Sequence, residues 1–116
     1  MDSEHVVALI TAPSAEVGER IARALVEGGL AACVNLVVPV RSIYTWQGKT
    51  SDDEEVLLVA KTTRAGFEGG FVELVASMHP YEVPEIIALP IVSGFRGYLE
   101  WIESVTKAGH DGNATA

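Results

Sequence analysis

The stretch that decides the fold is residues 31–63, AACVNLVVPVRSIYTWQGKTSDDEEVLLVAKTT, which has the pattern of two strands joined by a polar turn. The first strand is predicted over 31–46 and the second over 54–63. The segment 47–53 between them is polar and contains a glycine, which is typical of a hairpin, so the two strands should run antiparallel. Pro39 lies inside the first strand and predicts a bulge or a sheet edge, because proline cannot donate to a strand ladder.

Helices and strands alternate outward from this hairpin. Upstream, the apolar run 5–12 predicts a strand. Ser14 then predicts the start of a helix over 15–27, since its hydroxyl can accept from the free amides of the first turn. Downstream, apolar residues at helical spacing predict a second helix over 67–78, which Pro80 ends.

A strand over 85–92 and an amphipathic helix over 98–105 complete the pattern. The order strand, helix, strand, strand, helix, strand, followed by an extra helix, is that of the ferredoxin-like split βαβ fold. This α+β fold has one antiparallel sheet with two helices on one face. We expect one domain over 1–107, followed by a disordered tail over 108–116.

The predicted sheet is too apolar to be covered by two helices alone. In the first strand of the hairpin, both alternating sets are hydrophobic, with Val34 and Leu36 in one and Cys33 and Val37 in the other. The helices can cover only one of these sets. The open face is therefore expected to meet another copy of the chain, which would also give the protruding arm around Tyr44 a surface to pack on.

Composition and charge exclude several classes of protein. The 116 residues are 48% hydrophobic, which argues against a disordered chain, and their net charge of −8 argues against nucleic-acid binding. No apolar run approaches the roughly 20 residues of a membrane helix. With one cysteine and an acidic N-terminus unlike a signal peptide, the protein is expected to be cytoplasmic.

Familiar catalytic motifs are absent from the sequence. It contains no Gly-x-Ser-x-Gly elbow, no Walker loop, no His-Glu-x-x-His and no glycine-rich dinucleotide turn. Cys33 and His79 lie in different predicted elements, so a Cys-His dyad would depend on the fold bringing them together. We expect a binding protein and not an enzyme.

Four motifs together resemble the CutA divalent-cation tolerance family. They are LAACVN (30–35), SIYTWQGK (42–49), KTT (61–63) and HPYEVPEIIALP (79–90). The resemblance implies a ferredoxin-like homotrimer, cytoplasmic in bacteria, that is linked to tolerance of copper and other divalent cations. In architecture the family also resembles the trimeric nitrogen-regulatory signalling proteins, which bind small effectors between subunits.

Copper binding is the first function that this resemblance implies. Copper favours thiolate, imidazole and thioether donors, and the candidate ligands are Cys33, Met78 and His79. His5 and His110 lie near the chain ends.

The copper ligands described in the family resemble a cysteine in the first strand and a His-His pair before Pro-Tyr. Here those positions hold Ile10 and the pair Met78–His79, so only His79 matches. The alternative is structural: Met78 packs in the core, His79 caps the helix C-terminus, and Cys33 is a small buried hydrophobe.

The second candidate function is that of a trimeric sensor or scaffold, which binds a small effector or a partner peptide in a pocket between subunits. Lys61 interrupts an apolar strand, so its ammonium should either reach solvent at the end of the sheet or find a carboxylate partner, with Glu55, Glu82 and Glu85 as candidates. The aromatic side chains that could wall such a pocket are Tyr44, Trp46 and Tyr81. The alternative is an ion pair buried at a subunit interface, with the aromatic residues as interface anchors.

Overall fold

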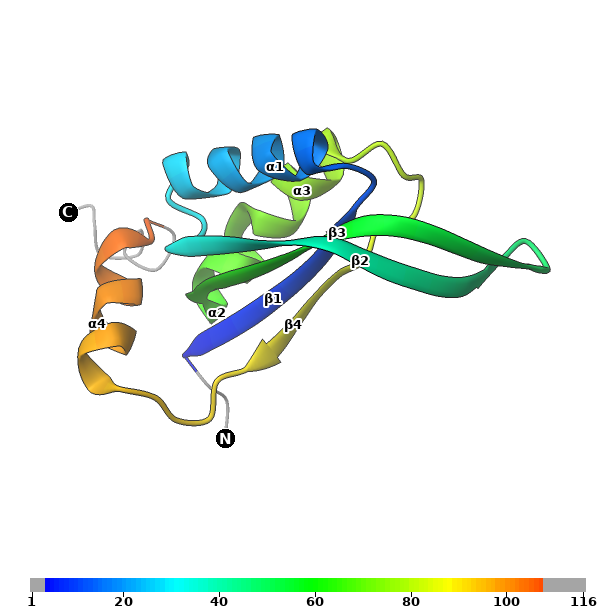
Figure 1. The fold of residues 1–116 in the computed structure, drawn as a ribbon. Coiled ribbons are helices and arrows are strands. Elements are labelled where there is room, and N and C mark those ends of the chain that lie inside the picture. The colour runs from blue at the N-terminus through cyan, green and yellow to red at the C-terminus, as the bar shows by residue number, and fades with distance from the viewer. Residues whose placement is uncertain (1–3, 108–116) are drawn as a thin grey trace.

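The computed structural model describes residues 4–107 (Figure 1). The predicted tail 108–116 lies outside the described residues. The elements, in chain order, are β1 (His5–Ala12), α1 (Ala15–Glu27), β2 (Cys33–Trp46), β3 (Lys49–Thr63), α2 (Arg64–Gly66), η1 (Phe67–Phe71), α3 (Val72–Met78), β4 (Ile86–Pro90) and α4 (Arg96–Val105).

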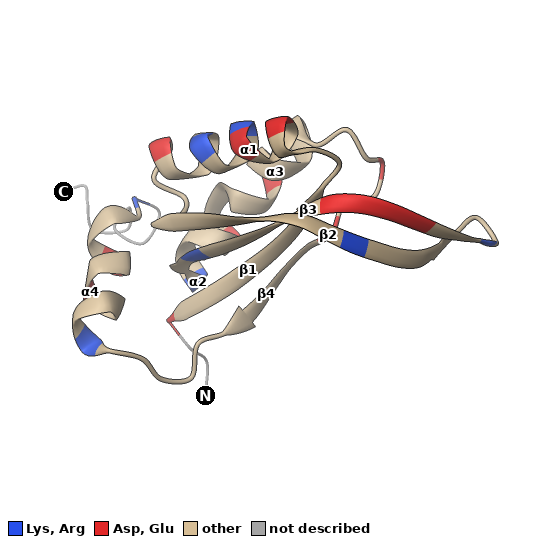
Figure 2. Ribbon diagram, viewed as in Figure 1, with Lys and Arg blue, Asp and Glu red and all other residues tan. Residues whose placement is uncertain are grey.

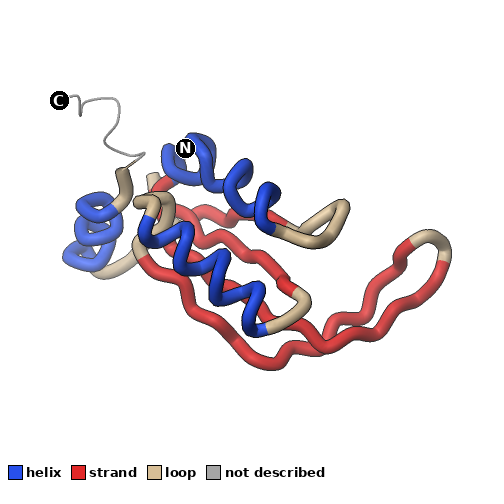
Figure 3. The backbone as a smooth tube through the Cα atoms, turned by 90° about the horizontal axis from the view of Figure 1, so that it is seen from above, coloured by secondary structure: helices blue, strands red, loops and turns tan. Residues whose placement is uncertain are grey.

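The four strands form one sheet in the order β2-β3-β1-β4, in which every neighbouring pair is antiparallel. This order places the first and third strands at the centre, as the ferredoxin-like plan requires. Helices α1 and α3 lie together on one face of the sheet, and the β2–β3 hairpin extends beyond the other strands (Figure 3). The predicted α+β class and the order of its elements are confirmed.

The core lies between the sheet and these two helices. Alternate residues of β1 are buried, and Ala8 and Ile10 are fully enclosed. Ser14 caps α1 as predicted, accepting from the Val17 amide at 3.2 Å. The large side chains that are fully buried are Phe71, Ile10, Ile21, Leu25, Leu58, Ile102 and Val75.

The predicted elements over 31–46, 85–92 and 98–105 differ from β2, β4 and α4 by one or two residues at their ends, and two other predicted boundaries are wrong by more. β3 begins at Lys49 and not at residue 54, because the polar residues 49–53 pair with β2. Side chains also form hydrogen bonds across this part of the hairpin, which we call the arm, as Arg41 does with Asp52. The second helical segment begins at Arg64 and is not one regular helix. Gly69 and Gly70 take non-helical backbone angles within it, with φ of +135° at Gly70, a conformation that favours glycine.

The predicted irregularity at Pro39 is confirmed as a bulge between Val37 and Val40. Before the bulge, Leu36 pairs with Leu58, which belongs to the buried set of β3. After it, Val40 pairs with Glu55, which belongs to the opposite alternating set of β3. The bulge therefore moves the even-numbered residues of β2 from one face of the sheet to the other.

The KTT motif joins β3 to the helical segment that follows. The Thr62 side chain is fully buried and its hydroxyl donates to the Leu30 carbonyl at 2.7 Å. Thr63 accepts from the Gly66 amide at 2.9 Å and so caps the first turn of α2. Both threonines thus satisfy backbone groups at the end of the sheet.

Thr62→Val should lower the free energy of unfolding by about 1–3 kcal/mol, because it keeps the shape of the side chain and leaves the Leu30 carbonyl without its donor. Denaturant unfolding measures the change. Thr50→Val, the same substitution on the exposed arm, should change stability by less than about 0.5 kcal/mol. Equal effects of the two variants would contradict the role given to Thr62.

Candidate functional site

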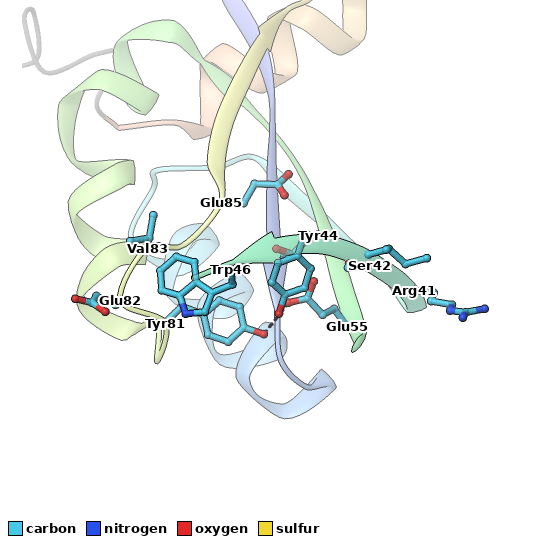
Figure 4. A pocket seen from close by; sticks show the side chains of 11 residues that line it. Arg41, Ser42, Tyr44, Trp46, Glu55, Tyr81, Glu82, Val83 and Glu85 are labelled. Carbon is cyan, nitrogen blue, oxygen red and sulfur yellow. Dashed lines mark hydrogen bonds between the residues drawn. The ribbon is translucent and has the colours of Figure 1, made fainter. Parts of the chain in front are cut away.

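A cavity of about 810 Å³ lies between the β2–β3 arm and the loop that precedes β4. Figure 4 shows Tyr44, Trp46, Tyr81 and Glu55 gathered around it, with Arg41 and Glu82 at its flanks. The lining residues are Thr11, Arg41, Ser42, Ile43, Tyr44, Trp46, Glu55, Tyr81, Glu82, Val83 and Glu85.

The bulge brings the arm's aromatic residues to this cavity. Tyr44 and Trp46 have the same alternation as Val40, which pairs with Glu55. All three therefore share the face of the arm that Glu55 occupies. Without the shift between Val37 and Val40, these aromatic side chains would point to the other face.

The loop side of the cavity is fixed by His79. Its Nε2 lies 2.7 Å from the Thr11 carbonyl oxygen, and its Nδ1 accepts from the Tyr81 amide at 3.2 Å. This pattern requires a neutral ring with the proton on Nε2. The rings of His79 and Tyr81 also pack with their centroids 4.8 Å apart. His79 thus holds the loop against the end of β1.

Tyr81 joins the two walls of the cavity. Its hydroxyl donates to Glu55 Oε2 at 2.6 Å, and the Glu55 residue is only 5% exposed. Burial raises the pKa of Tyr81 well above its usual range, and the hydrogen bond and the charge of Glu55 raise it further. The phenol is therefore a proton donor to the carboxylate across the neutral pH range.

Negative charge dominates the arm, where Figure 2 shows an acidic stretch on β3. Arg41 is held by Asp52 through two hydrogen bonds of 2.9 and 2.7 Å, so its charge is already compensated. The Tyr44 hydroxyl donates to Asp53, and this bond raises the pKa of Tyr44. These two donors of the arm are thus already directed at its own carboxylates.

Five of the six predicted pocket residues line the cavity: Tyr44, Trp46, Tyr81, Glu55 and Glu85. Lys61 does not. It lies six residues beyond Glu55 on β3, about 20 Å away along the strand, and its Nζ donates to Asn35 Oδ1. Lys61 therefore lies near the end of the sheet, which is one of its two expected placements, and its partner is an amide and not one of the candidate carboxylates.

Sequence reasoning did not find Arg41 and Thr11 as residues of the cavity. The signal for Arg41 is the bulge, since Arg41 directly follows it. Thr11 is the residue whose carbonyl accepts from His79, a contact across 68 positions that no local pattern indicates.

The three candidate copper ligands do not form one site in the described chain. Cys33 pairs with Lys61 at one end of the sheet, whereas His79 contacts Thr11 at the other. Met78 packs against the core. Within residues 4–107, no group of three or more His, Cys, Asp and Glu residues is placed to hold a metal ion.

Comparison with known proteins identifies the family. The sequence model of a protein family, described as CutA1 divalent ion tolerance protein, matches residues 6–105. The chain belongs to the CutA1 family. It is 54% identical over 100 residues to the divalent-cation tolerance protein CutA of Thermus thermophilus, covering 86% of this chain and 96% of that protein. It is 46% identical to human protein CutA, covering 90% of this chain and 58% of the human protein.

Solved structures of CutA1 proteins share the fold. The Thermus thermophilus structure superposes with a TM-score of 0.85 at 53% identity, covering 88% of this chain and 98% of that one. CutA1 from Shewanella sp. SIB1 gives a TM-score of 0.87 at 42% identity, covering 91% and 98%. Among the described residues, no helix is long and apolar enough to span a membrane.

Tyr44 and Tyr81 line the cavity and provide a test of its structure, and Tyr98 on α4 has a pKa shift in the same direction. The pKa values of Tyr44, Tyr81 and Tyr98 all lie above the ordinary 10.0, so each should form phenolate later in the native protein than in the unfolded chain. Their stabilising contribution is then complete below pH 10 and falls as the pH rises above it.

Phenolate absorbance and melting temperature between about pH 9 and 12 measure both effects. Tyr81→Phe should reduce the loss of stability at high pH. Native phenolate formation that coincides with that of the unfolded chain would contradict the hydrogen bond to Glu55.

Proposed function

We propose that this protein serves divalent-cation tolerance by binding a divalent metal ion, with copper as the preferred ion, in the cytoplasm. The observation that supports the proposal most directly is membership of the CutA1 family over residues 6–105. The net charge of −8 favours cations around the molecule. The names of some relatives place them in the chloroplast or the periplasm, so the cytoplasmic location has to be tested separately from metal binding.

One chain does not supply a copper site from the predicted ligands. Both ring nitrogens of His79 already have partners, and Cys33 lies at the other end of the sheet. Copper binding through His79 would have to use Nδ1 and replace the 3.2 Å bond from the Tyr81 amide. Because a single imidazole binds weakly, we propose that donors of a second copy complete the site.

Copper titration by calorimetry tests this proposal. His79→Ala should weaken copper binding by about tenfold or more, because it removes the one ligand that matches the family pattern. His110→Ala, the same substitution outside the described residues, is the control and should bind like the original protein. Unchanged affinity in His79→Ala would overturn the site, and the melting temperature of each variant checks that it is folded.

We further propose that the protein is a homotrimer that uses the open face of its sheet. One row across this face contains Asn35, Val59, Leu9 and Ile87, which are neighbours in the strand pairing. Ile87 and Leu89 are 50% and 48% exposed on β4, and Phe95 beyond it is 81% exposed. Apolar side chains this exposed and this close together are typical of an interface.

Ile87→Glu should dissociate the trimer in analytical ultracentrifugation, because it places a charge in the apolar row. Val26→Glu, on α1 and away from the open face of the sheet, where Val26 is 43% exposed, is the control and should leave the trimer intact. The melting temperature of the original protein should rise over about a hundredfold increase in concentration. A melting temperature independent of concentration would contradict coupled folding and assembly.

A second candidate function is the binding of a small ligand in the cavity. The specific observation that favours it is a hollow of about 810 Å³ with aromatic walls and a nearly buried carboxylate. This volume is within the range of small-molecule sites. The chain would then act as a sensor or scaffold whose ligand state changes with the availability of that molecule.

A further inference from the structure

We propose that the cavity between the β2–β3 arm and the loop before β4 binds an organic cation, meaning a primary ammonium or guanidinium group carried on an apolar body. This inference rests on the second candidate function and names its ligand class. It follows from three features of the cavity: a carboxylate oxygen without a donor, three aromatic side chains, and the pairing of the arginine in its lining with an aspartate.

Glu55 provides the charge that the ligand would meet. Its side chain lines the cavity and the residue is 5% exposed. Oε2 accepts from Tyr81, whereas Oε1 accepts no hydrogen bond from any residue in the range 4–107. Glu55 Oε1 is not among the fully buried unpartnered atoms of residues 4–107, so a donor that enters the cavity can reach it, and a donor that also carries positive charge stabilises the carboxylate most.

The aromatic walls favour the same ligand. Tyr44, Trp46 and Tyr81 line the cavity around Glu55 (Figure 4). Aromatic faces attract cations and also pack against an apolar body. The hydroxyls of Tyr44 and Tyr81 already donate to Asp53 and Glu55. A ligand would therefore contact the rings of these two residues and would not receive a hydrogen bond from their hydroxyls.

The charge around the cavity disfavours an anion. Arg41, a basic residue in the lining, is held by both carboxylate oxygens of Asp52. Glu82 and Glu85 add negative charge at the cavity. A small hydrated metal ion fits less well, because the carboxylates of the described cavity do not come together as a metal-binding group and aromatic walls cannot replace water ligands.

Calorimetry with three molecules of similar shape tests the proposal: phenethylamine, phenylethanol and phenylacetate. The full-length protein should bind the amine about tenfold or more tightly than the alcohol, and the acid most weakly, because only the amine makes a charge-assisted bond to Glu55. Glu55→Gln should lose this preference while keeping an oxygen that accepts from Tyr81. Glu54→Gln, on the next and exposed position, is the matched control and should bind like the original protein.

Other outcomes separate the ligand class from the cavity's function. Equal binding of amine and alcohol, both weakened by Trp46→Leu, would overturn the cation and leave the cavity as a binding site. Binding of none of the three would overturn both.

Two further outcomes concern other occupants. Displacement of the amine by copper chloride, with copper affinity lowered in Glu55→Gln, would overturn the proposal in favour of a metal site. Dissociation of the oligomer by Glu55→Gln would overturn it in favour of a second copy filling the cavity. Melting curves check that each variant is folded.

Discussion

The unequal length of the strands is the constraint on which the rest of the structure depends. β3 has 15 residues and β1 has 8, so only Val56–Thr63 pair with β1. That part of β3 builds the core with α1 and α3. The remaining part pairs with β2 alone and forms an arm, which a two-stranded ribbon cannot stabilise well by itself. The contacts between the arm and the loop before β4 are therefore both its support and the walls of the cavity.

The sequence was sufficient to predict the fold because the signals that define it are local. The Ser14 cap, the apolar spacing of α1 and the proline in β2 each indicate their own element. The arm was only partly predictable. Its polar residues look like a loop, and their pairing depends on contacts across the hairpin such as Arg41 with Asp52.

Five of the eleven residues that line the cavity were predicted from the sequence, and Lys61 shows why a sixth prediction failed. A lysine among apolar neighbours indicates that a partner is needed but not which one. Strand register decides that question, and it places Lys61 beside Cys33 and near Asn35, far from Glu55. His79 shows the reverse case. Its residue type suggests a metal ligand, whereas its two hydrogen bonds connect the loop before β4 to the end of β1.

The end of the sheet opposite the arm is covered by the C-terminal part of the described chain. There α4 lies across the end of the strands (Figure 1), and the Lys107 amide donates to the Gly29 carbonyl at 2.7 Å. Gly29 itself has φ of +73°, and a side chain there would meet Lys107. The last described residue thus fastens the chain to the turn after α1. The two ends of the molecule are consequently unlike. One end is covered by α4, and the other carries the arm and the cavity, which are open to ligands or partners.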